Sequence, residues 1–156
     1  MNPAFSPDGL RIAFGTPSEL RGQSELGLLA RASTASAWQG PTRLPVAGGF
    51  APRWSPDGTR LAYDLRLGDS SGIGVLPLGG APQTLVRQTA GFTRPQWPEW
   101  SPDSRTIYFY ATDANNIIGL YQVSATGGAP RLVVRFDVPQ RQLGPSSPAA
   151  IGNGMV

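Results

Sequence analysis

The sequence predicts an all-β protein that consists of about three four-stranded antiparallel blades of a β-propeller. One short motif occurs three times in the 156 residues, at 5–9, 54–58 and 100–104. Each copy precedes a stretch in which apolar and polar residues alternate, and the aspartates of successive copies lie 49 and 46 residues apart. A repeat of that length, with a turn signal between short strands, is typical of a propeller blade.

The repeated motif is an aromatic residue followed by Ser-Pro-Asp and, in two copies, Gly. Proline fixes φ near the value that a turn requires, aspartate can bond its own backbone, and glycine accepts positive φ. We therefore interpret the motif as the structural hairpin between the first two strands of each blade. Its residues are Phe5, Ser6, Pro7, Asp8, Gly9, Trp54, Ser55, Pro56, Asp57, Gly58, Trp100, Ser101, Pro102 and Asp103. In the third copy Ser104 replaces the glycine.

The first unit, residues 1–46, matches the repeat most loosely, and we expect a blade with a truncated start. Alternating apolar residues predict its later strands at 10–15, 26–32 and 42–46. Residues 33–41 are expected to form an enlarged turn, because the Gly-Gly-Ala-Pro signal of the other units is missing there.

The second unit, residues 47–87, and the third unit, residues 88–136, follow one scheme of four strands. The expected strands are 51–54, 59–65, 73–78 and 83–87 in the second unit, and 97–100, 105–112, 117–124 and 131–136 in the third. Both units place an identical Gly-Gly-Ala-Pro turn before their last strand. The remaining residues, 137–156, are either a linker or the start of a degenerate fourth blade.

The composition excludes several classes of function. The chain has no Cys and no His, so it has no disulfide, no thiolate nucleophile and no His-containing metal site. All 13 basic residues are Arg, scattered without a dense run. Nucleic-acid binding is therefore not expected, because phosphate recognition needs a concentrated basic stripe. Membrane insertion is not expected either, since no apolar stretch approaches the roughly 20 residues of a membrane helix.

The motif aspartates Asp8, Asp57 and Asp103 are better turn caps than catalytic groups. They would lie on separate hairpins around a ring, whereas catalytic carboxylates have to converge within several ångströms. The sequence also lacks the Gly-x-Ser-x-Gly elbow and the His of a hydrolase triad. We predict no catalytic, metal-binding or cofactor-binding residue and no cofactor. An enzyme is expected only if a longer parent protein carries another domain.

Two sets of aromatic residues recur with the motif and are expected to fill the space between blades. One set precedes the turns and the other ends the second strands: Phe5, Trp54 and Trp100, and then Phe14, Tyr63 and Phe109. Large rings suit the wedge between neighbouring sheets. Stacking on a ligand is the alternative interpretation.

Candidate binding residues lie on the loops at one end of the blades, because loops on a rigid scaffold are where function concentrates. These loops connect second to third strands, near 16–24, 66–72 and 112–116, or join successive blades, near 47–51, 88–96 and 137–147. The candidate partner-binding residues are Arg66, Asp69, Phe92, Arg94, Trp97, Asp113, Asn115 and Asn116. Trp and Arg are enriched at interface hot spots. For Trp97, packing within the loop that enters the third unit is the alternative.

The units resemble the TolB-like β-propeller repeat, which is similar to the WD repeat. The resemblance rests on Pro-x-aromatic-Ser-Pro-Asp and the following hydrophobic strand at 52–63 and 98–109, with the Gly-Gly-x-Pro turns at 79–82 and 127–130. Residues 3–14 match only the front half of the pattern. The resemblance covers about residues 3–136 and implies a parent ring of six or so blades.

The resemblance also implies a choice of roles. The predicted function is a non-enzymatic scaffold that binds a protein partner through blade-top loops, as TolB-like periplasmic adaptors or sensor propellers do. One alternative is the gating propeller of a prolyl-oligopeptidase-like serine hydrolase whose catalytic domain is not in this chain. Another is the extracytoplasmic sensor propeller of a receptor-like bacterial kinase. The resemblance alone favours a periplasmic or extracytoplasmic location. Self-association is expected if blade edges are open.

Overall fold

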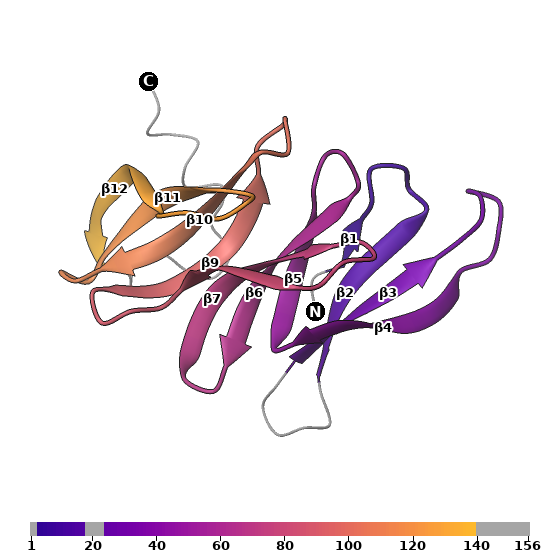
Figure 1. Cartoon of the computed structure of the whole chain (residues 1–156), viewed down its shortest axis with the longest axis horizontal. Helices are drawn as coiled ribbons and strands as arrows, with labels where there is room; N and C mark the ends of the chain where they lie inside the picture. Colours follow the sequence, from indigo (N-terminus) through magenta and orange to yellow (C-terminus); the bar gives the residue numbers. More distant parts are fainter. Residues whose placement is uncertain (1–2, 18–23, 140–156) are drawn as a thin grey trace.

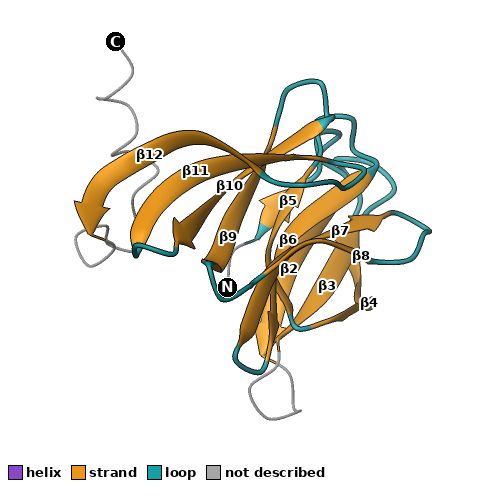
Figure 2. Ribbon diagram, turned by 60° about the vertical axis from the view of Figure 1, so that its left-hand side comes forward, coloured by secondary structure: helices purple, strands orange, loops and turns teal. Residues whose placement is uncertain are grey.

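The computed structural model describes residues 3–17 and 24–139, and every regular element in these ranges is a β-strand (Figure 2). Within the same ranges, no helix is long and apolar enough to span a membrane. The strands form three four-stranded antiparallel sheets that follow one another along the chain (Figure 1). The prediction of an all-β fold with three four-stranded blades is therefore confirmed.

Each sheet takes its four strands in chain order, so each is one blade. Blade 1 contains β1 (Ala4–Phe5), β2 (Arg11–Pro17), β3 (Ser24–Ala30) and β4 (Gln39–Ala47). Blade 2 contains β5 (Gly49–Trp54), β6 (Arg60–Leu67), β7 (Ser70–Pro77) and β8 (Gln83–Arg87). Blade 3 contains β9 (Phe92–Trp100), β10 (Thr106–Asp113), β11 (Ile117–Ser124) and β12 (Arg131–Pro139). The tail beyond residue 139 lies outside the described residues.

Several predicted loops are wrong because the strands are longer than expected. The expected loop at 66–72 is a two-residue turn, Gly68 and Asp69, between β6 and β7. The expected loop at 88–96 ends at residue 91, and Gly48 alone separates β4 from β5. Phe92 and Arg94 therefore lie in strand β9 and not in a loop, and Trp97 lies in the same strand. Much of the loop expected at 16–24 lies outside the described residues.

Bulges explain why the first strands of blades 2 and 3 extend past their prolines. Proline has no N–H for the ladder, so a central strand normally excludes it. Here Ala51 and Trp97, which precede Pro52 and Pro98, adopt φ of 48° and 58°. The pairing register shifts at both places, as it does at a β-bulge. The strand continues on the far side of each bulge, and a second bulge at Arg94 has φ of 53°.

The core lies between the blades, where facing sheets pack on each other. One cluster joins blades 1 and 2 through Leu26, Trp54 and Tyr63, and a second joins blades 2 and 3 through Ile73 and Phe109. Alternation along β6 produces this division, because successive side chains point to opposite faces of a strand. Trp54, Tyr63 and Phe109 are buried in these clusters as predicted.

Phe5 is a correction to the predicted core. Its side chain is 63 % exposed, although its ring lies 6.2 Å from that of Trp38. The aligned Trp54 is buried because blade 1 covers it, whereas no blade among the described residues covers the corresponding face of blade 1. Trp100 and Phe14 are only partly buried.

A polar clasp repeats between neighbouring blades. Trp54 Nε1 donates to the Ala4 carbonyl at 2.9 Å, and Trp100 Nε1 donates to the Arg53 carbonyl at 3.1 Å. A guanidinium from the preceding blade covers each indole at 4.8 Å, from Arg11 in the first case and Arg60 in the second. Indole and cation together fix the spacing of adjacent first strands.

The Ser-Pro-Asp turns carry the same internal hydrogen bonds in all three blades. In blade 2, Ser55 Oγ donates to Asp57 Oδ1 at 2.6 Å and accepts from the Arg60 N–H at 3.0 Å. Asp57 Oδ1 also accepts from the Thr59 N–H at 2.9 Å. These bonds hold the pKa of Asp57 well below its usual range, chiefly through the serine hydroxyl. The carboxylate thus caps its own turn.

Candidate functional site

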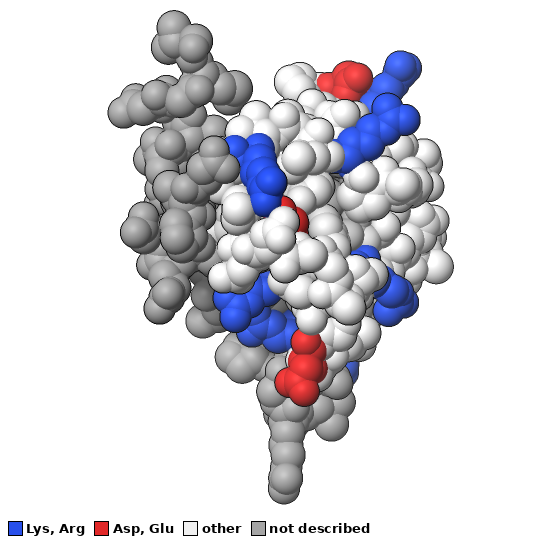
Figure 3. All heavy atoms as spheres, turned by 90° about the vertical axis from the view of Figure 1, so that its left-hand side faces the viewer, with Lys and Arg blue, Asp and Glu red and all other residues white. Residues whose placement is uncertain are grey.

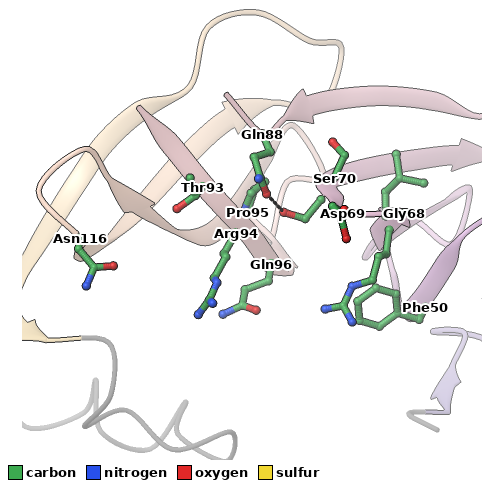
Figure 4. Close-up of a pocket in the computed structure, with 13 residues that line it drawn as sticks. Phe50, Gly68, Asp69, Ser70, Gln88, Thr93, Arg94, Pro95, Gln96 and Asn116 are labelled. Carbon is green, nitrogen blue, oxygen red and sulfur yellow. Dashed lines mark hydrogen bonds between the residues drawn. The ribbon is translucent and has the colours of Figure 1, made fainter. Parts of the chain in front are cut away.

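A pocket of about 730 Å³ opens between blades 2 and 3, at the end of the blades that carries the β6–β7 turn. We call it the inter-blade pocket; Figure 4 shows it at close range. Its residues come from β5, the end of β6, the β6–β7 turn, the start of β7, the residue after β8, the bulged part of β9 and the β10–β11 turn. Most of the lining side chains are polar or charged.

Arg66 reaches the pocket because of its place on β6. Tyr63 and Leu65 face blade 1, so the alternation of the strand turns Arg66 toward blade 3. Its guanidinium lies over the Phe50 ring, 5.3 Å from the ring centroid. Its backbone N–H donates to the Gly48 carbonyl at 2.8 Å. Gly48 has φ of 72°, and a Cβ there would overlap the Arg66 carbonyl oxygen, so only glycine suits this junction.

Arg94 reaches the pocket through the second bulge of β9. A bulge re-aims a side chain relative to the regular strand. Figure 4 shows the side chains of Arg94 and Gln96 extending toward the same side. Across the pocket, Ser71 Oγ donates to Gln88 Oε1 at 2.7 Å, which fixes the orientation of the Gln88 amide.

The pocket brings together four of the eight residues predicted to bind a partner. They are Arg66, Asp69, Arg94 and Asn116. Two of them come from turns and two from strands, and they belong to both blades. Their convergence was not visible in the sequence, which assigned them to three separate loops.

The other four predicted residues lie elsewhere. Phe92 packs in the core between blades, edge-on to Tyr121 with ring centroids 4.9 Å apart. Asp113 accepts the Asn115 N–H at 2.9 Å and pairs with Arg135 at 2.9 Å, so it closes the β10–β11 turn. Trp97 lies edge-on to Tyr110, with centroids 5.7 Å apart. Asn115 is exposed in the β10–β11 turn.

Asp64 is a residue that the sequence analysis did not single out. It lies on β6 directly before two lining residues of the pocket, Leu65 and Arg66. Only 1 % of Asp64 is exposed; Oδ1 accepts the Trp97 N–H at 2.7 Å, and Oδ2 has no hydrogen-bond partner in the described structure. Burial raises the pKa of this carboxyl to about 7, against the opposing effects of the Trp97 N–H, Arg53 and Arg66. Its signal in the sequence was a carboxylate inside the apolar run of β6.

On the face of the described surface at the blade 3 end, the charged side chains do not form one continuous patch. Figure 3 shows the basic residues at the blade 3 end separated by uncharged surface. No group of three or more His, Cys, Asp or Glu that could hold a metal ion occurs in residues 3–17 and 24–139. Among the motif aspartates, the Ser6 hydroxyl is the main cause that lowers the pKa of Asp8 to about 2.

Comparisons with known proteins identify the fold. No family model and no curated protein matches the sequence. Among solved structures, the chain is similar to a putative TolB from Agrobacterium tumefaciens, with a TM-score of 0.66 and 16 % identity over 87 % of this chain and 50 % of that one. It is similar to TolB from Acinetobacter baumannii, with a TM-score of 0.64 and 19 % identity over 87 % of this chain and 32 % of that one.

A third similar structure is the β-propeller domain of the Trilobed protease from Pyrococcus furiosus. Its TM-score is 0.63 and its identity 16 %, over 90 % of this chain and 42 % of that one. The chain thus spans about half the length of the first structure and about a third of the second. These likenesses confirm the predicted fold, that of TolB-like and other β-propeller domains.

Proposed function

We propose that the chain is a non-enzymatic propeller scaffold that binds a protein partner through the blade-top surface around the inter-blade pocket. The observation that carries this proposal is the convergence of Arg66, Asp69, Arg94 and Asn116 on one opening. Two strand segments and two short turns hold them. Side chains on such rigid elements lose little freedom when they bind.

The lining of the pocket favours a protein surface over a small apolar ligand. Small-molecule sites are lined predominantly by hydrophobic and aromatic side chains. Here the lining includes two guanidiniums, a carboxylate and several side-chain amides and hydroxyls. Arg is among the residues enriched at protein interfaces. A polar, charged opening of this kind suits a partner that supplies complementary polar groups.

The test is affinity capture with the tagged full chain from an envelope fraction of the source organism. Arg94→Glu changes the proposed surface, and Arg105→Glu is the matched control. Arg105 is also exposed, but it follows the Ser-Pro-Asp turn at the opposite end of blade 3. We expect a partner that the control variant retains and Arg94→Glu loses. Equal capture by the two variants, or no capture by the unaltered chain, contradicts the proposal.

A second candidate is the propeller part of a peptidase, which the likeness to the propeller domain of the Trilobed protease supports. The likeness concerns the fold, so the evidence has to come from the gene. A Gly-x-Ser-x-Gly elbow with an Asp and a His in the same reading frame would favour a peptidase. A kinase domain in that frame would favour the sensor alternative.

A further inference from the structure

We propose that the inter-blade pocket binds a carboxylate carried by an extended peptide segment of the partner, held between Arg66 and Arg94. The inference rests on the proposed function, because it specifies the chemistry that the blade-top surface recognises. The carboxylate can belong to an acidic side chain or to a chain terminus, and the experiment below distinguishes these sources.

The first argument is the charge of the pocket. In the described part of the chain, neither Arg66 nor Arg94 forms an ion pair, whereas Arg11, Arg53 and Arg60 all have acidic partners. The contact with Phe50 orients the Arg66 guanidinium without neutralising it. The lining therefore has two unpaired guanidiniums and a single carboxylate, that of Asp69.

The second argument is the supply of hydrogen-bond donors. The bond from Ser71 occupies Gln88 Oε1, and Gln88 Nε2 has no partner among the described residues. That amide nitrogen is left as a donor at the pocket wall. Each guanidinium adds several N–H groups in a planar fork that matches the two oxygens of a carboxylate. A carboxylate has about four lone-pair sites that accept hydrogen bonds and no donor, so it matches the hydrogen-bond donors that line this side of the pocket.

The third argument is the size of the pocket and the position of its acid. A volume of about 730 Å³ is several times that of a carboxylate, and the remaining space is flanked by the amides of Gln96 and Asn116. Such amides can both donate to and accept from a peptide backbone. Asp69 on the rim can accept hydrogen bonds from backbone N–H groups of the same peptide segment.

The experiment is a titration of the ¹⁵N-labelled full chain, followed by two-dimensional amide NMR at low ionic strength. Three peptides are compared: Gly-Ser-Glu-Glu-Gly with an amidated C-terminus, Gly-Ser-Gln-Gln-Gly with an amidated C-terminus, and Gly-Ser-Gln-Gln-Gly with a free C-terminus. All three carry an acetylated N-terminus. The first tests a side-chain carboxylate, the third tests a terminal one, and the second has neither.

We expect saturable shifts of the Gln88, Gln96 and Asn116 side-chain amides with at least one carboxylate peptide and none with the neutral peptide. Charge-assisted hydrogen bonds are strong enough that Arg66→Gln or Arg94→Gln should weaken binding about tenfold or more. Arg105→Gln, which removes the same charge elsewhere, should change the affinity less than about twofold. The spectra of the variants also report whether each remains folded.

Absence of shifts at about 10 mM peptide overturns the carboxylate inference. Equal binding of the neutral peptide, or shifts that Arg66→Gln and Arg94→Gln leave intact, does the same. The proposed function would survive these results if the capture experiment still showed partner loss with Arg94→Glu. Partner capture that is indifferent to Arg94→Glu would instead remove the proposed function itself.

Discussion

Replacing Asp64 with Asn should remove a pH dependence of stability that this single carboxyl creates. In the folded chain Asp64 keeps its proton up to a pKa of about 7, whereas an unfolded chain releases it near 3.8. Between these values the folded state binds the additional proton, so the free energy of unfolding falls as pH rises. The fall amounts to about 2.5 kcal/mol between pH 5 and pH 8. The chain has no His that would titrate in the same window.

The substitution is conservative, because an amide oxygen can still accept the Trp97 N–H that Asp64 Oδ1 accepts at 2.7 Å. It places an amide nitrogen where Oδ2 has no partner, which costs about 1–3 kcal/mol at every pH. The slope with pH is therefore the measurement that matters, not the absolute stability. Urea denaturation of both chains at pH 5, 6, 7 and 8 gives that slope.

The expected result is a free energy of unfolding that falls with pH in the unaltered chain and stays nearly level in Asp64→Asn. Asp69→Asn is the control, because it removes an exposed carboxylate next to the same pocket. The control should follow the unaltered chain. A level curve for the unaltered chain, or an equal slope in Asp64→Asn, would refute the assignment of this pH dependence to Asp64.

Three further substitutions test the packing between and within blades, each by urea denaturation at pH 5. Trp54→Ala should lower the free energy of unfolding by about 3–5 kcal/mol, and Trp54→Phe should recover most of that loss. If Trp54→Ala changed the free energy of unfolding by less than about 0.5 kcal/mol, the indole would not be part of the core. Gly74→Ala should lower the free energy of unfolding by about 1–3 kcal/mol, because a Cβ there overlaps the Tyr63 ring. The control Gly91→Ala should leave it nearly unchanged, and equal effects of the two substitutions would contradict the overlap. Ser104→Ala should lower the free energy of unfolding by about 1 kcal/mol, because Ser104 Oγ accepts the Asp57 N–H at 3.1 Å. An unchanged midpoint of urea denaturation would show that this hydrogen bond between blades does not stabilise the fold.

Local patterns made the blades predictable. The turn motifs and the alternation of apolar and polar residues each depend on only a few neighbouring residues. Strands β8 and β11 were therefore predicted with the bounds that the structure has. The first strands were less predictable, because the bulges at Ala51 and Trp97 depend on how a neighbouring strand pairs across them. A proline normally indicates the end of a strand, because it has no N–H for the ladder, and here a bulge lets the strand continue past it.

The site was predictable only in part, for a related reason. Arg66, Asp69, Arg94 and Asn116 were chosen because they lie on expected loops at one end of the blades, yet the pocket that unites them depends on how blade 2 packs against blade 3. Phe92 was assigned to the connection between the second and third blades, but its ring packs against the hydrophobic cluster between these blades. The significance of Asp64 depends on burial by the next blade, which no local pattern encodes.

The polar clasp between blades makes some repeat units interchangeable and others not. Blade 2 carries both halves of the clasp: Trp54 reaches back to blade 1, while the Arg53 carbonyl and Arg60 receive the indole of the following blade. A duplicated blade 2, inserted after itself, would therefore find the indole, the carbonyl and the guanidinium of the clasp on either side, although its Arg53 would lose the ion pair with Glu99. Blade 3 has Thr106 where Arg11 and Arg60 stand in the other blades, so a tandem copy of it would meet a neighbour without the covering cation. If the array were lengthened, by gene duplication or by design, blade 2 would thus be the unit that preserves the clasp at each new junction.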